Sequence, residues 1–359
     1  MKQSLNVFII GVAVAVLMFG GMACAPDVEK DALAARAAES RAGEQLVLSF
    51  AGDCTLGSED YLRNTPVSFI SMIKERGFDW PFSGVYDIFS ADDLTLVNLE
   101  GTFTEHAKAA DKAFAFRAPP AFAEVLTLGG VEAVNLANNH TMDYGWRGYE
   151  DTKAALDAQG VAYCGHCQST VVEAKGQKIA LVGFTYPLIK SELEKLYAEI
   201  AACREQEDIA LIVVSFHWGR EMTYTLKGEQ VRAAKGAIDH GADVVVGTHP
   251  HVLQSMEMYE GKPIFYSLGN FSFGGNTSPP DFDTAIFQLA YDLTPEGPEL
   301  ARLEVIPCSV SQLPQGSYQD FRPVVVEGGD AERILGKLAK QAEGFPEDFF
   351  DTGLWILRP

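Results

Sequence analysis

The segment Asp243-Val-Val-Val-Gly-Thr-His-Pro-His-Val252 combines a short apolar run with two closely spaced histidines. The three valines predict a buried strand, and Gly247 leads from it into an extended turn. Side chains alternate along an extended chain, so we expect His249 and His251 to point to the same side. Pro250 favours this geometry because its ring keeps the preceding residue out of the helical region. Neutral imidazoles suit a divalent metal ion, and a polar loop with hydrogen-bonded histidines is the alternative.

Other apolar runs alternate with helical patterns along the chain. We expect strands at 46–51, 94–99, 131–136, 178–183, 208–214 and 263–267, and helices at 121–128, 149–159, 191–207 and 230–240. Strands that alternate with helices indicate a layered α/β fold. The near-continuous apolar character of the strands indicates a sheet that is covered on both faces. In such folds, ligands bind where the parallel strands end.

Polar side chains follow these apolar runs at the predicted strand ends. They are Asp53, Asn98, Glu100, Asn138, Asn139, His140, His217, His249, His251 and Asn270. Asparagine and histidine are uncommon in strands, and a buried carboxylate is costly unless it is paired or bound to a metal ion. Each residue alone has a simpler interpretation as a turn or a helix cap. Together, two carboxylates, an amide oxygen and several imidazoles can hold two divalent cations that activate a water molecule.

Six motifs carry this pattern: Gly52-Asp53-x3-Gly57, Asn98-Leu99-Glu100-Gly101, Ala137-Asn138-Asn139-His140-x2-Asp143-x-Gly145, His217-Trp218-Gly219-x-Glu221, Gly247-Thr248-His249-Pro250-His251-Val252 and Ser267-Leu268-Gly269-Asn270-Phe271. Together they resemble the CapA family of capsule and poly-γ-glutamate synthesis proteins, which is related to the calcineurin-like metallophosphoesterases. The resemblance implies a four-layer α/β sandwich, in which helices flank two packed mixed sheets. We therefore expect a single large domain at 45–320, with a C-terminal helical extension at 321–359 packed on it.

The resemblance also implies roles for individual residues. Glu100 stands where the parent superfamily has a bridging aspartate, and His140 matches a histidine that acts near the leaving group as a general acid. Two divalent ions (Mn, Fe or Zn) would be held by Asp53, Glu100, Asn139, His217, His249 and His251, with His217 and His249 at the second ion. Phosphoesterases usually carry Asp-x-His on the first strand, whereas position 55 is threonine. The first ion therefore has one imidazole fewer, which leaves a non-catalytic role open.

The first residues indicate export. Residues 1–24 contain a positive start, an almost wholly apolar run and then small residues, which is the pattern of a secretory signal peptide. Cys24 resembles the lipidated cysteine of bacterial lipoproteins, and ordinary cleavage after Ala25 is the alternative. Residues 25–44 predict a helical or disordered tether. We expect a protein of the cell envelope, on the outer face of the membrane or in the periplasm, that contacts the membrane only through a lipid anchor or the signal.

The charge content restricts the classes of binding partner, and the cysteine content bears on redox chemistry. The 28 Lys and Arg residues against 49 Asp and Glu argue against nucleic acid, which is bound through basic residues. An anionic substrate must meet positive charge locally, and metal ions would supply it. Cys164 and Cys167 form a single CxxC motif. Because export favours oxidation, we expect a surface disulfide or a pair of free thiols there, and not the reaction centre.

These observations favour an exported metal-dependent hydrolase or transferase. Its substrate would be an anionic polymer or a phosphoester in the synthesis of poly-γ-glutamate or another capsular polymer. Candidate substrate-binding residues are Asn98, Asn138, Asn270, Arg117 and Arg220. The alternative is a non-catalytic, metal-binding partner of a membrane polymer synthase or exporter. A thiol oxidoreductase built on the CxxC motif is a third hypothesis.

Overall fold

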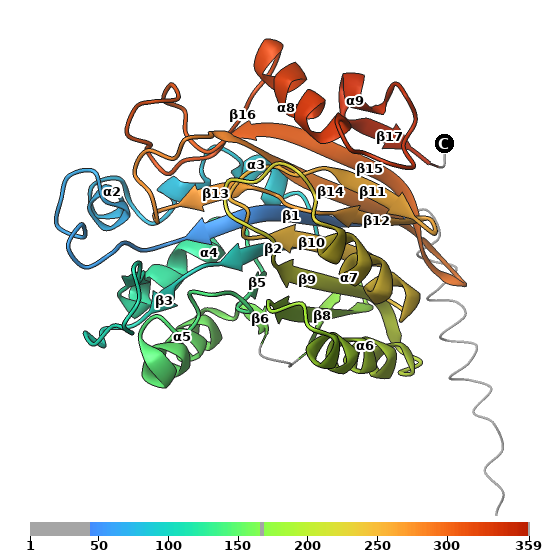
Figure 1. Ribbon diagram of the computed structural model, residues 1–359, viewed down its shortest axis with the longest axis horizontal. Helices are drawn as coiled ribbons and strands as arrows, with labels where there is room; N and C mark the ends of the chain where they lie inside the picture. Colours follow the sequence, from blue (N-terminus) through green and yellow to red (C-terminus); the bar gives the residue numbers. More distant parts are fainter. Residues whose placement is uncertain (1–43, 166–168, 358–359) are drawn as a thin grey trace, which may run out of the picture. The chain divides into compact units, whose positions relative to one another are not determined.

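Long apolar strands form two β-sheets at the centre of the protein, whose computed structural model describes residues 44–165 and 169–357 (Figure 1). In these residues the larger sheet has nine strands: β1 (Gln45–Thr55), β2 (Leu94–Leu99), β5 (Ala133–Asn135), β6 (Ala162–Cys164), β13 (Asn270–Phe273), β14 (Asp283–Thr294), β15 (Gly297–Ser309), β16 (Val324–Val325) and β17 (Leu354–Ile356). The smaller sheet has six: β7 (Thr170–Ala174), β8 (Gln177–Thr185), β9 (Ile209–His217), β10 (Val244–Thr248), β11 (Met256–Tyr259) and β12 (Lys262–Phe265). A separate two-stranded sheet pairs β3 (Thr102–Phe103) with β4 (Arg117–Ala118).

Parallel strands form the middle of each sheet. In the larger sheet β1, β2, β5 and β6 run parallel, whereas β14 and β15 are antiparallel. In the smaller sheet β8, β9, β10 and β12 run parallel between the antiparallel edge strands β7 and β11. Both sheets are therefore mixed, and their parallel strands bring their carboxyl ends to a common edge.

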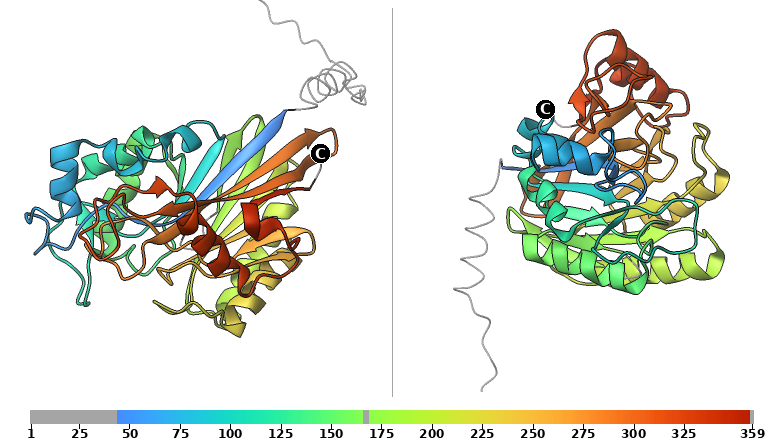
Figure 2. Two further views of the ribbon diagram at one scale, coloured as in Figure 1. Left: turned by 90° about the horizontal axis from the view of Figure 1, so that it is seen from above. Right: turned by 90° about the vertical axis from the view of Figure 1, so that its left-hand side faces the viewer.

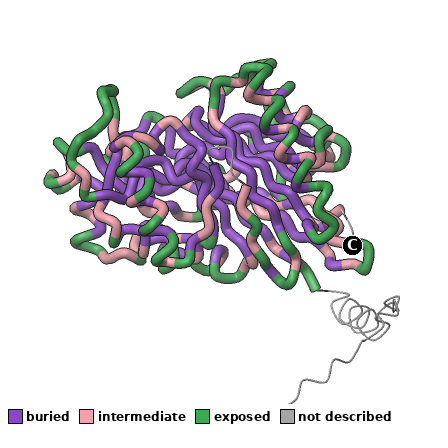
Figure 3. Tube along the Cα trace, turned by 90° about the horizontal axis from the view of Figure 1, so that it is seen from below, coloured by how far each residue is buried: buried purple, intermediate pink, exposed green. Residues whose placement is uncertain are grey.

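The two sheets face each other across an apolar layer. Phe50 of β1, Phe265 of β12 and Phe287 of β14 meet in it, and each is only 1% exposed. The ring centroids of Phe50 and Phe265 are 6.4 Å apart, and those of Phe265 and Phe287 are 4.7 Å apart. Burying one such side chain contributes about 1.5–3 kcal/mol. Figure 3 shows that buried residues follow the strands through the interior.

Helices cover the outer face of each sheet. The larger sheet packs against α2 (Phe69–Arg76), α3 (Tyr86–Phe89), α4 (Glu124–Leu128), α5 (Gly145–Gln159) and the 3-10 helices Trp80–Phe82 and Pro120–Ala123. The smaller sheet packs against α6 (Lys190–Arg204) and α7 (Gly228–Asp239). The order of helices, sheet, sheet and helices confirms the predicted four-layer α/β sandwich. The single helix predicted at 121–128 is wrong in its first half, where the backbone forms a 3-10 turn that begins at a proline.

The C-terminal residues contact both sheets. β16 and β17 pair with β15 of the larger sheet, and α8 (Gly329–Ala339) lies beside β15 (Figure 2). Its buried residues Ile334, Leu335 and Leu338 belong to the apolar layer between the sheets. The short helix α9 (Phe349–Thr352) lies between α8 and β17 in the chain. After α8, the Met258 N–H of β11 donates to the Glu343 carbonyl at 2.9 Å. Residues beyond 320 therefore contribute strands to the fold as well as helices.

Several predicted features lie outside the described residues. These are the signal peptide with Cys24, the tether up to residue 43, and Cys167. Within 44–165 and 169–357, no helix has both the length and the apolar character needed to span a membrane. Cys164 is 1% exposed with a free thiol, so the surface disulfide is wrong and the predicted alternative of a free thiol holds for this residue, which β6 turns into the core. Burial raises the pKa of Cys164 to about 12, which does not suit a redox thiol.

Asp92 lies two residues before β2, and we expect its replacement to stabilise the protein in a pH-dependent way. Its Oδ2 accepts from Thr95 Oγ1 at 2.7 Å, whereas its Oδ1 is buried without a hydrogen-bond partner. Burial raises the pKa of Asp92 to about 7. The folded protein therefore binds a proton that the unfolded chain releases near pH 4, and its stability falls as the pH rises through this window. We expect Asp92→Asn to raise the free energy of unfolding by about 2 kcal/mol at pH 8 and little at pH 4.

Urea unfolding at the two pH values measures this difference. Asp87→Asn is the control, because Asp87 lies on α3 nearby but is exposed. A gain of equal size at pH 4 and pH 8 would show that the titration of Asp92 is not its cause.

Candidate metal centre

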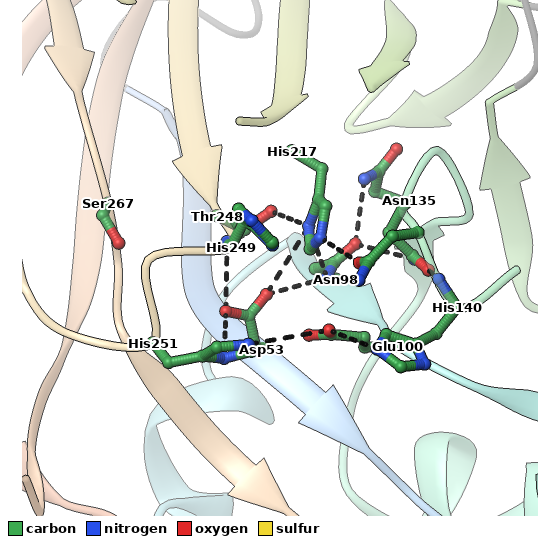
Figure 4. Close-up of polar contacts among 12 residues, drawn as sticks. Asp53, Asn98, Glu100, Asn135, His140, His217, Thr248, His249, His251 and Ser267 are labelled. Carbon is green, nitrogen blue, oxygen red and sulfur yellow. Dashed lines mark hydrogen bonds and ion pairs between the residues drawn. The ribbon is translucent and has the colours of Figure 1, made fainter. Parts of the chain in front are cut away.

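The predicted site residues converge where parallel strands of both sheets end (Figure 4). The register places Asp53 of β1 opposite Asn98 of β2 and Asn270 of β13. His217 ends β9 opposite Thr248 of β10. Among these residues the larger sheet supplies the carboxylate and both amides, and the smaller sheet supplies the imidazole.

The loop after β10 turns sharply at both of its histidines. His249 has a φ of 94° and His251 a φ of 57°, so the extended geometry predicted for them is wrong. Tertiary contacts hold this backbone: the His249 N–H donates to Asp53 Oδ2 at 3.2 Å, and the Pro250 carbonyl accepts from the Met222 N–H at 2.9 Å. The two imidazole rings still converge, with centroids 5.9 Å apart. Strained backbone of this kind concentrates at functional sites.

Two buried carboxylates differ in how their oxygens are satisfied. Asp53 Oδ1 accepts from Asn98 Nδ2 at 2.8 Å, and Asp53 Oδ2 lies 3.3 Å from His251 Nδ1. Both oxygens of Glu100 are buried, and no group in the described residues donates a hydrogen bond to them. His140 Nε2 and His251 Nε2 lie 3.6 and 3.8 Å from Glu100 Oε1, beyond hydrogen-bonding distance. Glu100 thus lacks the partners that a buried carboxylate requires.

These unsatisfied atoms fit a divalent cation. His249 Nδ1 is also buried without a hydrogen-bond partner. Two groups of side chains bring one ligand atom from each member within 4.8 Å of one another: Asp53 with Glu100 and His251, and Glu221 with His249 and His251. Oxygen and nitrogen donors without thiolate suit Mn, Fe or Zn.

Burial keeps two of the imidazoles neutral, which is the form that binds metal. It lowers the pKa of His217 well below the ordinary value and that of His249 to about 4, and the neighbouring histidines add to both shifts. Burial also lowers the pKa of His251, but Glu100 and Asp53 together outweigh it and raise this pKa to about 10. Burial raises the pKa of Glu100 against the attraction of His251. We place the proton for which this pair competes on His251, because Asp53 also faces its ring.

Amide side chains join the carboxylates to the imidazoles. Asn98 Oδ1 accepts from Asn135 Nδ2 at 2.9 Å and from Asn138 Nδ2 at 3.1 Å. Asn139 Oδ1 lies 2.7 Å from His217 Nε2. Asn98 and Asn138 are almost fully buried in this network, in which Asn98 also contacts the ligand candidate Asp53.

A buried acidic group orients His140. The ring Nδ1 lies 2.8 Å from Asp143 Oδ2, and Asp143 also accepts from the Phe116 N–H and from Lys112 Nζ, both at 2.6 Å. These contacts leave His140 Nε2 on the side of Glu100. Neither Asp143 nor Lys112 was predicted as a site residue. Asp143 stands in the motif that contains His140, whereas Lys112 carries no local sequence signal.

A cavity of about 270 Å³ opens beside these residues. Glu100, His140, Glu221, His251 and Asn270 line its polar side. Asn270 Oδ1 lies 2.9 Å from His251 Nδ1, so this predicted residue is part of the site. Glu221 was not among the predicted ligands, although it completes the motif that begins at His217.

The two predicted arginines do not line this cavity. Arg117 is buried, and its guanidinium donates to Asp60 Oδ1 at 2.7 Å and to the carbonyls of Glu105 and His106 at 3.1 and 2.9 Å. Arg220 is exposed, and neither arginine is among the described residues that line the cavity. The contacts of Arg117 with the carbonyls of Glu105 and His106 hold the loop after β3.

Comparison with known proteins identifies the family of the chain. Residues 47–275 match the family described as bacterial capsule synthesis protein PGA_cap. The chain belongs to this family. This PGA_cap family member is 31% identical over 338 residues to the PGA biosynthesis protein CapA of Bacillus subtilis (strain 168), covering 87% of this chain and 82% of the relative. It is 28% identical over 326 residues to the capsule biosynthesis protein CapA of Bacillus anthracis, covering 84% and 74%.

A third relative carries a different description. A probable polyglutamine synthesis accessory protein of Mycobacterium tuberculosis (strain ATCC 25618 / H37Rv) is 28% identical over 274 residues, covering 65% of this chain and 71% of the relative. These relatives confirm the predicted CapA family.

Solved structures give a looser likeness. A hypothetical protein from Thermus thermophilus has a TM-score of 0.43 at 17% identity, covering 78% of this chain and 96% of that one. The 5'-nucleotidase from Candida albicans SC5314 has a TM-score of 0.40 at 11% identity, covering 70% and 52%. Membership of the PGA_cap family therefore rests on sequence.

Proposed function

We propose that this member of the PGA_cap family is an exported, metal-dependent hydrolase or transferase that acts in the synthesis of a capsular polymer, with poly-γ-glutamate as that polymer. The observation that carries the proposal is Glu100, whose two buried oxygens lack any described hydrogen-bond donor. The residues that would hold two divalent ions with it are Asp53, Asn139, His217, His249 and His251. The names of the two Bacillus relatives support a role in capsule synthesis. The signal-like residues 1–24 support export to the cell envelope, with lipid attachment at Cys24.

The side chains of the centre supply binding, orientation and proton transfer. When bound, a pair of divalent ions supplies the charge that activates water and stabilises the oxygens of a phosphoester or amide-like group. Asn98 fixes the Asp53 carboxylate through its Nδ2. His140 presents Nε2 to the cavity, where it can give a proton to a leaving group within hydrogen-bonding reach. Asp143 holds the His140 ring through Nδ1 and thereby keeps Nε2 in this orientation.

Metal analysis combined with an activity screen tests the proposal. We expect the signal-free protein to hold close to two divalent ions and to cleave members of a phosphodiester and γ-glutamyl panel. His251 belongs to both groups of ligand candidates. His251→Ala should therefore remove about one ion per chain and lower activity by about 100-fold. His240→Ala, at an exposed histidine after α7, is the matched control. Unchanged metal content in both His251→Ala and Asp53→Asn would end the two-metal model.

A non-catalytic role is the second candidate, and Thr55 favours it. The resemblance places a histidine at this position, whereas the Thr55 hydroxyl is buried without a hydrogen-bond partner and is a poorer ligand. The mycobacterial relative is described as an accessory protein. In this role the protein binds metal and joins membrane subunits of a polymer synthase or exporter. This role predicts that the metal-loaded protein is inactive on the whole panel and co-purifies with membrane subunits. That result would support the non-catalytic role over the catalytic one.

A further inference from the structure

The cavity beside the metal centre has an apolar wall that the proposed chemistry does not use. Phe114, Phe116, Met222, Phe273, Pro279 and Pro280 form it. Phe114 and Met222 are 57% and 41% exposed. Scattered apolar side chains are normal on a protein surface, but a group of them around one cavity indicates a contact with a ligand or a partner.

This wall begins at the histidines of the centre. The Phe116 ring lies against His140, with centroids 4.5 Å apart, and the Phe273 ring lies against His251, with centroids 4.9 Å apart. A group that reacts between these two histidines must therefore place its neighbouring atoms against the two phenylalanine rings. The wall is thus part of the same site and not a separate surface.

Gly275 keeps the space between the two rings open. A Cβ at this position would lie 2.7 Å from Phe273 Cζ and 3.1 Å from Phe116 Cζ. Any side chain here would therefore displace the ring tips and narrow the cavity. The volume of about 270 Å³ exceeds that of an engineered apolar cavity of about 150 Å³ that binds benzene, so a group of ring size fits.

The charges around the cavity disfavour an anionic group at this wall. Among the described residues that line the cavity none is lysine or arginine, whereas Glu100 and Glu221 are both acidic. Lys112 lies near His140, but its Nζ donates to Asp143 Oδ1 and to the Asn139 carbonyl at 2.6 and 2.9 Å. Apart from His251, which faces Asp53 and Glu100, the described residues that line the cavity offer a polyanionic chain no cation, and Glu100 and Glu221 would repel it.

We propose that the centre acts on a substrate whose reacting group is joined to an uncharged hydrocarbon portion, aromatic or branched aliphatic, that lies between Phe116 and Phe273. This inference rests on the proposed metal-dependent function and restricts its substrate. The charged part of a polymer lies outside the cavity, and the hydrocarbon portion occupies the space that Gly275 leaves open.

Binding of non-hydrolysable phosphonates to the Mn²⁺-loaded full chain tests the inference by calorimetry. Methylphosphonate reports the centre alone, whereas benzylphosphonate and isopentylphosphonate add an aromatic or a branched group. We expect at least one of the larger ligands to bind about tenfold more tightly than methylphosphonate, because it buries more apolar area. Tighter binding of benzylphosphonate would identify an aromatic group, and tighter binding of isopentylphosphonate would identify a branched aliphatic group.

Three variants test whether the larger phosphonate binds more tightly because it contacts this apolar wall. Gly275→Ala should reduce the advantage of the larger ligand to about twofold, and methylphosphonate binding to the same variant measures any effect on the centre itself. Phe114→Ser, at an exposed position, should lower the advantage of the larger ligand about threefold. Leu128→Ser is the control, because Leu128 is also exposed but does not line the cavity.

The outcomes separate this inference from the proposed function. Equal affinity for all three phosphonates in protein that holds metal would overturn the inference and leave the metal centre standing. An advantage that survives both Gly275→Ala and Phe114→Ser would also overturn it, because the hydrocarbon would then bind elsewhere. Protein that takes up no metal would overturn the proposed function and this inference together.

Discussion

Replacing Glu100 by glutamine is expected to remove most of the bound metal and to lower activity about a thousandfold, while the metal-free protein becomes more stable. The carboxylate is fully buried, and neither of its oxygens accepts a hydrogen bond from the described residues. Glutamine keeps the shape but removes the charge that would bind a cation. In the metal-free state the Glu100 charge is buried without a hydrogen bond, which costs more than a neutral amide even with protonated His251 3.8 Å away, so we expect a gain of about 1 kcal/mol.

A second buried glutamate provides the control for this substitution. Glu257 accepts from Tyr266 Oη and pairs with Lys235 Nζ, both at 2.7 Å. Glu257→Gln should therefore destabilise the protein by about 2 kcal/mol and leave its metal content unchanged. Metal content by elemental analysis and urea unfolding in the presence of a chelator measure both effects. If Glu100→Gln kept its full complement of metal, or lost stability as Glu257→Gln does, Glu100 would be a structural residue.

Gly52→Ala is expected to destabilise the protein by about 3 kcal/mol or more, although it adds a single methyl group. A Cβ at this position would lie 2.0 Å from the Gly269 carbonyl oxygen and 3.0 Å from that of Leu268. Both contacts are with backbone, which cannot rotate away as a side chain can. The Asp53 N–H donates to the same Gly269 oxygen at 2.9 Å, so the methyl group would also displace Asp53 and reduce metal binding.

The same substitution in helix α8 should have the opposite sign. A Cβ on Gly336 would meet no atom within 4 Å, and alanine is favoured over glycine in a helix interior by about 1 kcal/mol. Gly336→Ala should therefore raise the midpoint of thermal unfolding, and Gly52→Ala should lower it. A neutral Gly52→Ala would mean that β1 and the segment before β13 approach less closely than the structure shows.

Much of the centre was predictable because parallel strands bring their ends to one edge. Asp53, Asn98 and His217 stand at or near the ends of apolar runs, so the chain order of the motifs is enough to gather them. Gly160 likewise ends α5 with a φ of 70°, as a glycine after a helical pattern predicts. In each of these cases a local pattern and one general rule determine the position.

Features that depend on long-range contacts were not predictable. The turned backbone at His249 depends on a carboxylate 196 residues away in the sequence, and the contact of Lys112 with Asp143 spans 31 residues. Arg117 is held by Asp60, 57 residues earlier, which no local pattern reveals. A single sequence shows which residues could make such contacts, but the packing of the whole chain determines which contacts form.

The division of the centre between two sheets makes its dimensions a property of the whole interior. Asp53 and Glu100 lie in or directly after strands of one sheet, whereas His249 and His251 follow β10 of the other. Apolar side chains such as Phe265 separate the two layers. A smaller or larger residue in that layer would shift one set of ligand candidates against the other. The spacing of the donor atoms is therefore set by the thickness of a hydrocarbon interior whose residues touch neither ion nor substrate.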